Sequence, residues 1–459
     1  MVQTIGSNRV KEYEGYVDYN YRPDKDDLVC EYFIEPAKGI SLEEAAQRVA
    51  SESSIGTWTD IGTLSQELFD ELSPKIFFID KKRGVVRIAY SKELFEGSNI
   101  PQILSAVAGN VFGMIDVKKI KLMDIDFPES FTKSYRGPYY GVEGVRRLMG
   151  VRHRPFVGTI VKPKIGLSEA NHASVAYQAW VGGCDYVKDD ENLTSMSFNN
   201  FYNRVNLTLK ARAKAERETG EKKAYLPNIT APFKEMTKRA EYVISRGGDF
   251  VMVDVLTIGW SAVQELRDMD LNVVYHGHRA MHAAFTRDPH HGVSMLVVAK
   301  LCRLIGIDQL HIGGMVGKMY EGAEEVKSVG EAIEQRVVKQ NIATHRLKEE
   351  WFDLRPMLAV CSGGLHPSKV APIMHGMGRD IIIQAGGGIH GHPRGTIAGA
   401  KAMRQAVDAE MQGLTAKEYA KTHSELREAL EKWDKPITRK RTTPRKKVSA
   451  KKRVIVKRK

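Results

Sequence analysis

The stretch FVGTIVKPKIGLSEANHASVAYQAWVGGCDYVKDDEN, residues 156–192, decides the fold. An apolar run, FVGTIV, is followed by a helix-length segment and then by a second run, CDYVK, which ends in charged residues. Strands of a parallel sheet read as continuous apolar runs because helices cover both faces of the sheet. The stretch therefore predicts a strand, helix, strand unit with polar groups at the end of each strand.

The same unit recurs along the chain. Eight apolar runs alternate with helix-length segments, at 156–161, 184–188, 224–229, 250–256, 272–276, 307–312, 357–362 and 381–386. Eight such runs over a span of about 240 residues favour a closed (β/α)8 TIM barrel over an open doubly wound sheet. No GxGxxG motif opens the first unit, which counts against a dinucleotide-binding sheet.

The residues before the barrel show a different pattern. Strand-like runs at 13–21, 28–36, 75–80, 84–90 and 119–127 are interrupted by two predicted helices, one starting at Ser41 and one following Pro101. Ser41 is a suitable helix N-cap because Glu44 follows three residues later. We therefore expect an α/β protein with three parts: an N-terminal α+β, ferredoxin-like domain (1–136), a barrel domain with C-terminal helices (137–433) and a basic disordered tail (434–459).

The net charge of +13 comes entirely from this tail. Residues 435–459 contain 13 of the 69 Lys and Arg and no Asp or Glu, which leaves 56 basic and 56 acidic side chains in the preceding residues. A like-charge block interrupted by Pro is typical of disordered chain. We expect a solvated appendage or a segment that contacts polyanions, whereas the neutral body argues against a nucleic-acid-binding fold.

Membrane, disulfide and zinc proteins are not expected. No run reaches the roughly eighteen apolar residues of a membrane span, and the polar N-terminus does not resemble a signal peptide, so the cytoplasm is the expected location. The four cysteines lie far apart and form no CxxC pair. This spacing argues against a disulfide framework or a zinc ribbon.

Polar residues and glycines follow most of the eight runs. Barrel enzymes build their active sites at the C-terminal ends of the strands, where such residues come together. Ordinary surface exposure explains one or two of these positions but not the whole set. The set is Lys162, Lys188, Asp190, Glu191, Asn228, His278, Arg279, His311, Ser362 and Gly386–Gly388.

The segment around Lys188 has the spacing of a metal site. Lys188 and Asp190 are two apart, so a strand directs both to one side, and Glu191 follows where a loop can turn it inward. Two carboxylates suit a hard cation such as Mg2+, but a lysine ammonium would repel it. A buried, neutral lysine can react with CO2 to give an anionic carbamate. An isolated KDDE is more often a surface salt-bridge cluster, but the strand end favours the metal site.

Other strand ends suit phosphate groups. Lys162-Pro163-Lys164 can supply a proton shuttle, a phosphate clamp or a solvated loop charge, and the adjacent His278 and Arg279 suit an anion. Glycine-rich turns expose backbone N–H groups that bind phosphate oxygens. Such turns occur at 313–317, 362–364 and 386–388. The pattern indicates a small, doubly phosphorylated substrate that chelates a metal.

The segment GGMVGKM, 313–319, resembles an ATP-binding P-loop only superficially. That motif requires a glycine at Ile312 and a hydroxyl at Met319. A glycine-hinged loop that carries Lys318 to the mouth of the barrel is the simpler interpretation.

From about Gly15 to Ala406 the sequence resembles the large subunit of ribulose-1,5-bisphosphate carboxylase/oxygenase (RuBisCO). The residues within its motifs resemble those of the archaeal form III group more than those of the plant enzymes. The motifs that carry the resemblance are AxESSxGTW (50–58), AGNVFGM (108–114), GTIVKPKIGL (158–167), GGCDYVKDDEN (182–192), HRAMHA (278–283), HIGGMVGKM (311–319), SGGLHP (362–367) and QAGGGIHGHP (384–393).

The resemblance implies a role for each matching residue. Lys188 would be carbamylated and bind Mg2+ with Asp190 and Glu191. Lys162 would assist enolisation and the final protonation, supported by Lys164, and Lys318 would close over the substrate. One end of ribulose-1,5-bisphosphate would be held by His278, Arg279, His311 and Ser362, and the other by Thr57, Trp58, Gly363, Gly364, Gly386 and Gly387.

The resemblance also implies an oligomer and a reaction. Glu52 and Asn110 would complete the site of a neighbouring subunit, which requires a homodimer or an assembly of dimers, with no small subunit. The reaction would add CO2 or O2 to the enediolate of the substrate and give 3-phosphoglycerate.

A RuBisCO-like enolase or isomerase that does not carboxylate is the alternative. Two departures from the family pattern bear on closure of the Lys318 loop: Gly314 stands where many members have Thr, and Tyr320 is inserted after Met319.

Overall fold

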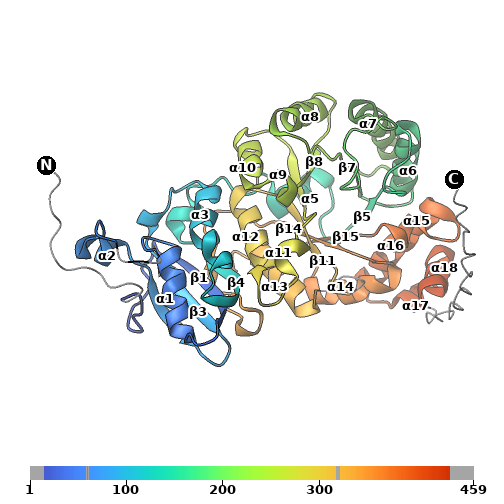
Figure 1. The fold of residues 1–459 in the computed structure, drawn as a ribbon. Coiled ribbons are helices and arrows are strands. Elements are labelled where there is room, and N and C mark those ends of the chain that lie inside the picture. The colour runs from blue at the N-terminus through green and yellow to red at the C-terminus, as the bar shows by residue number, and fades with distance from the viewer. Residues whose placement is uncertain (1–14, 58, 60, 317–320, 435–459) are drawn as a thin grey trace, which may run out of the picture.

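The computed structural model describes residues 15–57, 59, 61–316 and 321–434. The N-terminal elements lie at one end of the molecule, and the barrel with its surrounding helices forms the remainder (Figure 1). The predicted site residues Trp58 and Lys318, the inserted Tyr320 and the basic tail lie outside the described residues.

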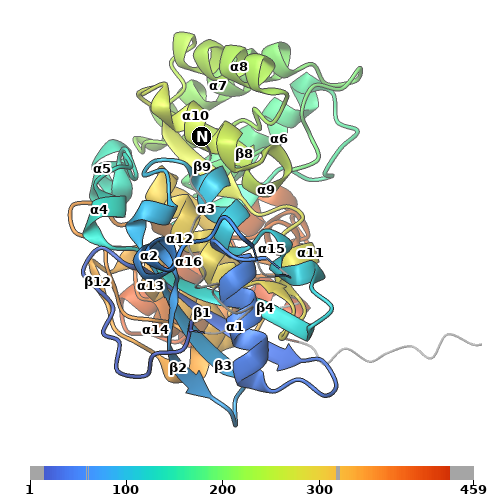
Figure 2. The same cartoon turned by 60° about the vertical axis from the view of Figure 1, so that its left-hand side comes forward.

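The N-terminal part has the order of elements of a ferredoxin-like domain, β-α-β-β-α-β. Its strands are in the order β4-β1-β3-β2, and β1 runs antiparallel to both β3 and β4. Helix α1 lies across this sheet (Figure 2) and buries Ala45, Ala46 and Val49. The elements are β1 (Leu28–Pro36), α1 (Leu42–Glu52), α2 (Gln66–Leu72), β2 (Lys75–Asp80), β3 (Val85–Tyr90), η1 (Lys92–Leu94), α3 (Ile100–Val107), η2 (Asn110–Gly113) and β4 (Val117–Asp126).

The prediction of a strand at 13–21 is wrong for the described part of that segment. From Gly15 to Tyr21 only Val17 makes a β-bridge, with Ile76. The side chain of Asp18 accepts hydrogen bonds from the backbone N–H groups of Asn20 and Tyr21. This local turn competes with strand formation because it uses the same backbone donors.

The eight predicted runs all form parallel strands of one sheet, which confirms the barrel. The sheet order is β7-β6-β5-β15-β14-β11-β9-β8. Hydrogen bonds from Ile229 N to Met252 O (3.0 Å) and from Met252 N to Pro227 O (2.9 Å) join its two ends. The strands are β5 (Phe156–Ile160), β6 (Tyr186–Lys188), β7 (Ala224–Leu226), β8 (Phe250–Asp254), β9 (Val274–His278), β11 (Gln309–Gly313), β14 (Leu358–Ser362) and β15 (Ile381–Gln384).

Helix α5 (Gly141–Met149) closes the N-terminal end of the barrel. Its Val142, Val145 and Met149 pack against barrel side chains such as Phe156 and Met252. With this end filled, the opposite end, where the strands finish, is the one available to a ligand.

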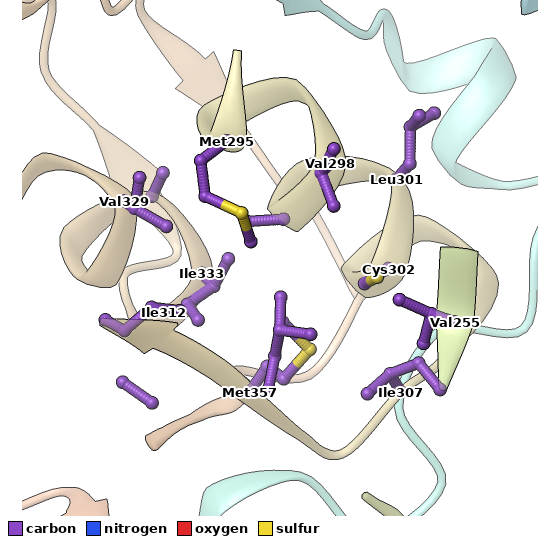
Figure 3. Close-up of a cluster of buried hydrophobic side chains, with 14 of the residues drawn as sticks. Val255, Met295, Val298, Leu301, Cys302, Ile307, Ile312, Val329, Ile333 and Met357 are labelled. Atoms are coloured by element: carbon purple, nitrogen blue, oxygen red, sulfur yellow. The ribbon is translucent and has the colours of Figure 1, made fainter. Parts of the chain in front are cut away.

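Helices surround the barrel and pack on its outer face. Figure 3 shows one such contact, where Met295 of α12 and Ile333 of α13 gather near Ile312 of β11. The four cysteines are buried and unpaired. The helices are α4 (Glu129–Thr132), α6 (Glu169–Val181), α7 (Phe201–Thr219), α8 (Phe233–Ser245), α9 (Val255–Ile258), α10 (Trp260–Asp268), α11 (Ala283–Thr286), α12 (Met295–Ile305), α13 (Ala323–Glu334), η3 (Ile342–Thr344), η4 (Pro367–Lys369), α14 (Val370–Met377), α15 (Gly387–His390), α16 (Gly395–Met411), α17 (Ala416–Tyr419) and α18 (Ser424–Trp433).

Strand pairing and buried polar contacts join the N-terminal sheet to the barrel. Strand β10 (Gly292–Val293), which follows β9 and α11, pairs in parallel with β4, while β12 (Val337–Val338) and β13 (Glu349–Glu350) form a separate hairpin. The buried Lys300 Nζ of α12 lies 2.8 Å from Asp124 Oδ1 of β4.

The domain boundaries at residues 136 and 433 remain predictions. Within the part of the chain that the structure describes, no helix has the length and apolar character needed to cross a membrane.

Candidate active site

A cavity of about 770 Å³ lies at the C-terminal ends of the barrel strands. The strands place their last residues around it because parallel strands all end at the same rim. Many of the predicted site residues line this cavity: Lys162, Lys164, Lys188, Glu191, His278, Arg279, His311, Ser362, Gly363, Gly364, Gly386 and Gly387. The structure thus brings together residues that are far apart in the sequence.

The end of β6 separates Lys188 and Asp190 from Asp189. Lys188 and Glu191 line the cavity, and the buried Asp190 carboxylate accepts a hydrogen bond from Lys162 of the cavity wall. Asp189 points to the other side, where its carboxylate lies 3.0 Å from Arg204 Nε. The alternation expected of a strand is therefore present, with one acid in the site and the next in the surrounding helical layer.

Lys188 is buried beside acidic groups. Its side chain is 1% exposed, and its Nζ donates to Asp189 O (3.0 Å) and lies 3.6 Å from Glu191 Oε2. Burial lowers the pKa of Lys188, although Glu191 and Asp190 oppose the shift. A lowered pKa increases the share of the neutral amine, which is the form that reacts with CO2.

Two lysines at the cavity contact the two carboxylates. Lys162 Nζ lies 2.7 Å from Asp190 Oδ2, and Lys164 Nζ lies 3.6 Å from Glu191 Oε1. Burial alone would raise the pKa of Glu191, but Lys188, His278 and Lys164 lower it to about 2. Glu191 can therefore serve as an anionic ligand at neutral pH.

The donor set fits a divalent cation only if Lys188 takes part. In the described ranges, no group of three His, Cys, Asp or Glu side chains is placed to hold a metal. Asp190 and Glu191 can offer two oxygen ligands, and the neighbouring Lys188 is the group that can offer a third as a carbamate. Hard cations prefer such oxygen ligands.

Arg279 and His278 line the cavity after strand β9. Arg279 Nη2 lies 2.8 Å from Glu321 Oε1, and both side chains are buried. His278 Nδ1 lies 3.1 Å from Asp254 Oδ1, which leaves its Nε2 directed towards Glu191 at 3.7 Å. The two residues can thus present a positive group and an oriented imidazole to one end of an anionic substrate.

Two glycine-rich turns that contact each other also line the cavity. Gly363 and Gly364 follow β14, and Gly386–Gly388 follow β15. A side chain at Gly388 would bring its Cβ within 2.1 Å of Leu365 O. Glycine at this position therefore lets the turns approach closely, and turns of this kind expose backbone N–H groups to a phosphate.

Two models of one protein family match most of the chain. The family model described as the ribulose bisphosphate carboxylase large chain, N-terminal domain, matches residues 15–131, and the catalytic-domain model of the same chain matches residues 141–433. The chain belongs to the ribulose bisphosphate carboxylase large-chain family. The enzyme class is therefore a carboxylase, a carbon–carbon lyase, and members of this family are metal-dependent enzymes.

Archaeal members of the family are similar over nearly the whole chain. The ribulose bisphosphate carboxylase of Methanosarcina mazei is 51% identical and that of Pyrococcus furiosus 46%, covering 91% and 93% of this chain and 98% of each relative. A sulfate complex of the octameric Rubisco from Pyrococcus horikoshii has a TM-score of 0.85 at 44% identity, covering 93% of this chain and 98% of that one. The dimeric Rubisco from Hyperthermus butylicus has a TM-score of 0.86 at 43% identity, covering 92% and 99%. The resemblance to archaeal RuBisCO is confirmed.

Four of the described predicted site residues do not line the cavity of this single chain: the buried Asp190, which Lys162 contacts from the cavity wall, and three residues of the N-terminal part. Glu52 and Asn110 lie in the N-terminal domain, where Asn110 Nδ2 donates to Glu52 Oε1 at 3.0 Å, and Thr57 follows the same helix. The contact of Glu52 with Asn110 forms one polar patch from two motifs that are 58 residues apart. Their predicted role in a neighbouring RuBisCO site stays a prediction.

The first departure from the RuBisCO pattern has a local explanation. A Cβ added to Gly314 would lie 2.9 Å from the carbonyl oxygen of Ser362. A Thr at this position would therefore require the backbone to shift, so the glycine matches the close packing of the β11 and β14 turns. The second departure, Tyr320, lies outside the described residues.

Sequence reasoning missed several residues at the RuBisCO site. His276 and Gln309 lie two residues before His278 and His311, and Trp433 and His366 line the cavity with stacked rings 5.9 Å apart. Side chains two residues apart on a strand point to the same side, so the positions of His278 and His311 could have indicated that His276 and Gln309 also point inward. Nothing in the sequence around Trp433 indicates that α18 reaches the cavity.

Proposed function

We propose that this chain catalyses the Mg2+-dependent addition of CO2, or of O2, to ribulose-1,5-bisphosphate, and that carboxylation gives 3-phosphoglycerate. The observation that carries the proposal is the position of Lys188, which is buried beside Asp190 and Glu191 at the mouth of the barrel. Family membership supports the same reaction.

The metal would be held by Asp190, Glu191 and a carbamate that CO2 forms on Lys188. Carbamylation replaces a cation by an anion, which turns the three residues into a uniformly anionic set. When bound, Mg2+ would polarise the substrate oxygens and stabilise the negative charge that develops on them.

Lys162 is the proposed proton carrier, and Lys164 supports it electrostatically. Lys162 Nζ lies on the cavity wall and is held 2.7 Å from Asp190 Oδ2, so its position is defined before the substrate binds. Its side chain is 28% exposed, which leaves it accessible to a ligand in the cavity. It would deliver the final proton, and Lys318 would close over the substrate.

The two phosphates would bind to two groups of the residues that line the cavity. One group comprises His278, Arg279, His311 and Ser362, and the other comprises Gly363, Gly364, Gly386 and Gly387. Thr57 and Trp58 of a partner subunit would join the second group. This arrangement would orient the sugar chain across the metal ligands.

The active unit would be a homodimer or an assembly of dimers without a small subunit, working in the cytoplasm. In this arrangement Glu52 and Asn110 of one subunit complete the site of the other. The proposal is supported by the absence of both residues from the cavity of their own described chain.

Carboxylase activity is tested by incubating the purified chain with labelled bicarbonate, Mg2+ and ribulose-1,5-bisphosphate. We expect labelled 3-phosphoglycerate and a higher initial rate after preincubation with CO2 and Mg2+. Consumption of the bisphosphate without incorporation of label would overturn the proposal and favour an enolase or isomerase.

A further inference from the structure

A second cavity, of about 500 Å³, lies between the N-terminal sheet and the hairpin formed by β12 and β13. It shares no lining residue with the cavity at the barrel mouth. Acidic side chains outnumber basic ones in its lining, which holds Asp24, Asp27, Asp126, Glu129, Glu349 and Glu350 against Lys25, Arg87 and Lys348. Arg87 is already engaged, because its Nε lies 2.9 Å from Glu31 Oε2.

Lys300 of α12 is the buried cation beside this cavity, and its hydrogen-bonding capacity is used. Its Nζ lies 2.8 Å from Asp124 Oδ1 and 3.2 Å from Glu349 Oε2, and it donates to Ile125 O at 2.8 Å. The side chains of Lys300, Asp124 and Glu349 are all fully buried. An ammonium group carries three donors, so none remains for a further acceptor.

Two acidic groups next to Lys300 lack partners within the described residues. Asp126 lies two residues after Asp124 on β4, lines the cavity, and makes no hydrogen bond or ion pair with any residue that the structure describes. Glu349 also lines the cavity and is 2% exposed, and its Oε1 has no hydrogen-bond partner in the described part of the chain. Three carboxylates therefore share one ammonium, which leaves an excess of negative charge.

This excess changes the protonation of the carboxylates. Burial raises the pKa of Asp126 to about 6 and that of Glu349 well above its usual value, and Asp124 acts in the same direction, whereas Lys300 opposes both shifts. Lys348 also lowers the pKa of Asp126, but its side chain is exposed. Because unpaired buried charge is costly, these carboxylates either take up protons or bind a cation.

The lining suits an organic cation better than a metal ion. Across the described ranges, no three His, Cys, Asp or Glu side chains are placed to hold a metal. Asp126 and Glu349 are the inner acids, whereas Asp24, Glu129 and Glu350 are exposed and mark the outer part. Apolar side chains complete the lining: Val29, Phe77, Phe127, Leu347 and Phe352. A chain of methylene groups with a positive charge at each end matches this combination of acidic and apolar surfaces.

We propose that this cavity is a binding site for a small aliphatic diammonium ion, with one ammonium held by Asp126 and Glu349 and the other by the exposed acids. The bound ion compensates the excess negative charge and joins β4 of the N-terminal sheet to β13. It thereby stabilises the contact between the two parts of the chain. The inference does not depend on the proposed carboxylase function.

Isothermal titration calorimetry of the full chain with 1,4-diaminobutane at pH 8 tests the site directly. We expect one site per chain, binding that is about tenfold weaker or more for 1-aminobutane, and none for 1,4-butanediol, since only the diammonium pairs with both groups of acids. Asp126→Asn should weaken diamine binding by about tenfold or more. The matched surface variant Asp249→Asn should change it by less than about twofold. Absence of diamine binding, equal binding of the monoamine, or unchanged affinity in Asp126→Asn would overturn the proposal.

Thermal unfolding distinguishes a binding site from a structural carboxylate. A carboxyl group whose pKa is raised on folding destabilises the protein above the folded value, so Asp126→Asn without diamine should unfold at a higher temperature than wild type at pH 8. Saturating diamine should raise the unfolding temperature of wild type but not that of the variant. A lower unfolding temperature of the variant without diamine would show that Asp126 already has a partner, which would contradict the proposal.

The pH dependence of diamine binding identifies the inner acids as the site. With its pKa at about 6, Asp126 is mostly protonated at pH 5.5 and ionised at pH 8. Aliphatic ammonium groups keep their charge at both values, and exposed carboxylates remain ionised. Binding should therefore be about fourfold weaker or more at pH 5.5 than at pH 8. Equal affinity at the two pH values would place the diamine on the exposed carboxylates alone and would refute the inner site.

Discussion

Replacing Asp189 by Asn is expected to destabilise the protein strongly although Asp189 does not face the cavity. The Asp189 carboxylate is fully buried and lies 3.0 Å from both Arg204 Nε and His172 Nε2. It also accepts hydrogen bonds from Tyr225 Oη (2.8 Å) and Asn228 N (3.0 Å). The substitution removes the negative charge that these donors share.

The magnitude follows from the charge that would be left behind. The Arg204 side chain is also fully buried, so the amide would leave its cation uncompensated. Breaking a buried ion pair in this way typically costs about 3–5 kcal/mol. This is a large part of the roughly 5–15 kcal/mol by which a domain is stable.

The effect should depend on pH in a defined direction. Burial alone would raise the pKa of Asp189, but Arg204, His172 and the hydrogen bonds to the carboxylate lower it far below its usual value. A lowered pKa contributes stability above the unfolded value of about 3.9, and this contribution is lost as the pH falls below it. The difference between wild type and Asp189→Asn should therefore be full at pH 7 and shrink below about pH 4.

Urea unfolding followed by fluorescence and circular dichroism at pH 7 and pH 3.5 measures this difference. Asp249→Asn is the matched control, because Asp249 pairs with Arg212 at 3.1 Å while its side chain is 49% exposed. A surface pair of this kind contributes about 0–1 kcal/mol. A loss below about 1 kcal/mol in Asp189→Asn, or a loss that does not change with pH, would refute the reasoning.

Three further outcomes are expected. Lys188→Ala should abolish carboxylation and its activation by CO2 and Mg2+, measured with labelled bicarbonate; normal turnover would show that the metal site is misassigned. Glu52→Gln and Lys162→Ala, each inactive alone, should regain partial activity when their subunits are mixed, and mixtures that stay inactive despite proven subunit exchange would contradict a shared site. Removing residues 435–459 should leave turnover nearly unchanged but weaken binding to duplex DNA at low salt, since this segment holds 13 basic and no acidic residues; equal DNA binding by both forms would exclude the tail as the contact.

Much of the fold was predictable from local patterns. The eight apolar runs became the eight barrel strands because burial on both faces requires continuous apolar sequence. The N-terminal strand predicted at 13–21 failed because the side chain of Asp18 takes the backbone N–H groups that a strand would need. In this segment the short polar side chain of Asp18 therefore determines the backbone conformation more than the apolar periodicity does.

The cavity residues at the strand ends were predictable for a related reason. Parallel strands of a barrel end at one rim, so polar residues that follow successive runs have to meet there. Lys188, Asp190 and Glu191 could therefore be grouped from spacing alone. The residues alone left Lys162 open as a proton shuttle, a phosphate clamp or a solvated charge, and motif resemblance supplied its individual role.

Contacts between neighbouring strands were decided only by the tertiary structure. Side chains alternate in direction along β9 and β11, which predicts that His276 and Gln309 point inward. The register that pairs these two residues depends on how the whole barrel closes. Trp433 reaches the cavity because α18 packs beside the turns after β14 and β15, which no local pattern encodes. The sequence determines the side of a strand on which a residue lies, because that side follows from backbone geometry. The neighbours of that residue on adjacent strands depend on the packing of every other element, so only the tertiary structure decides them.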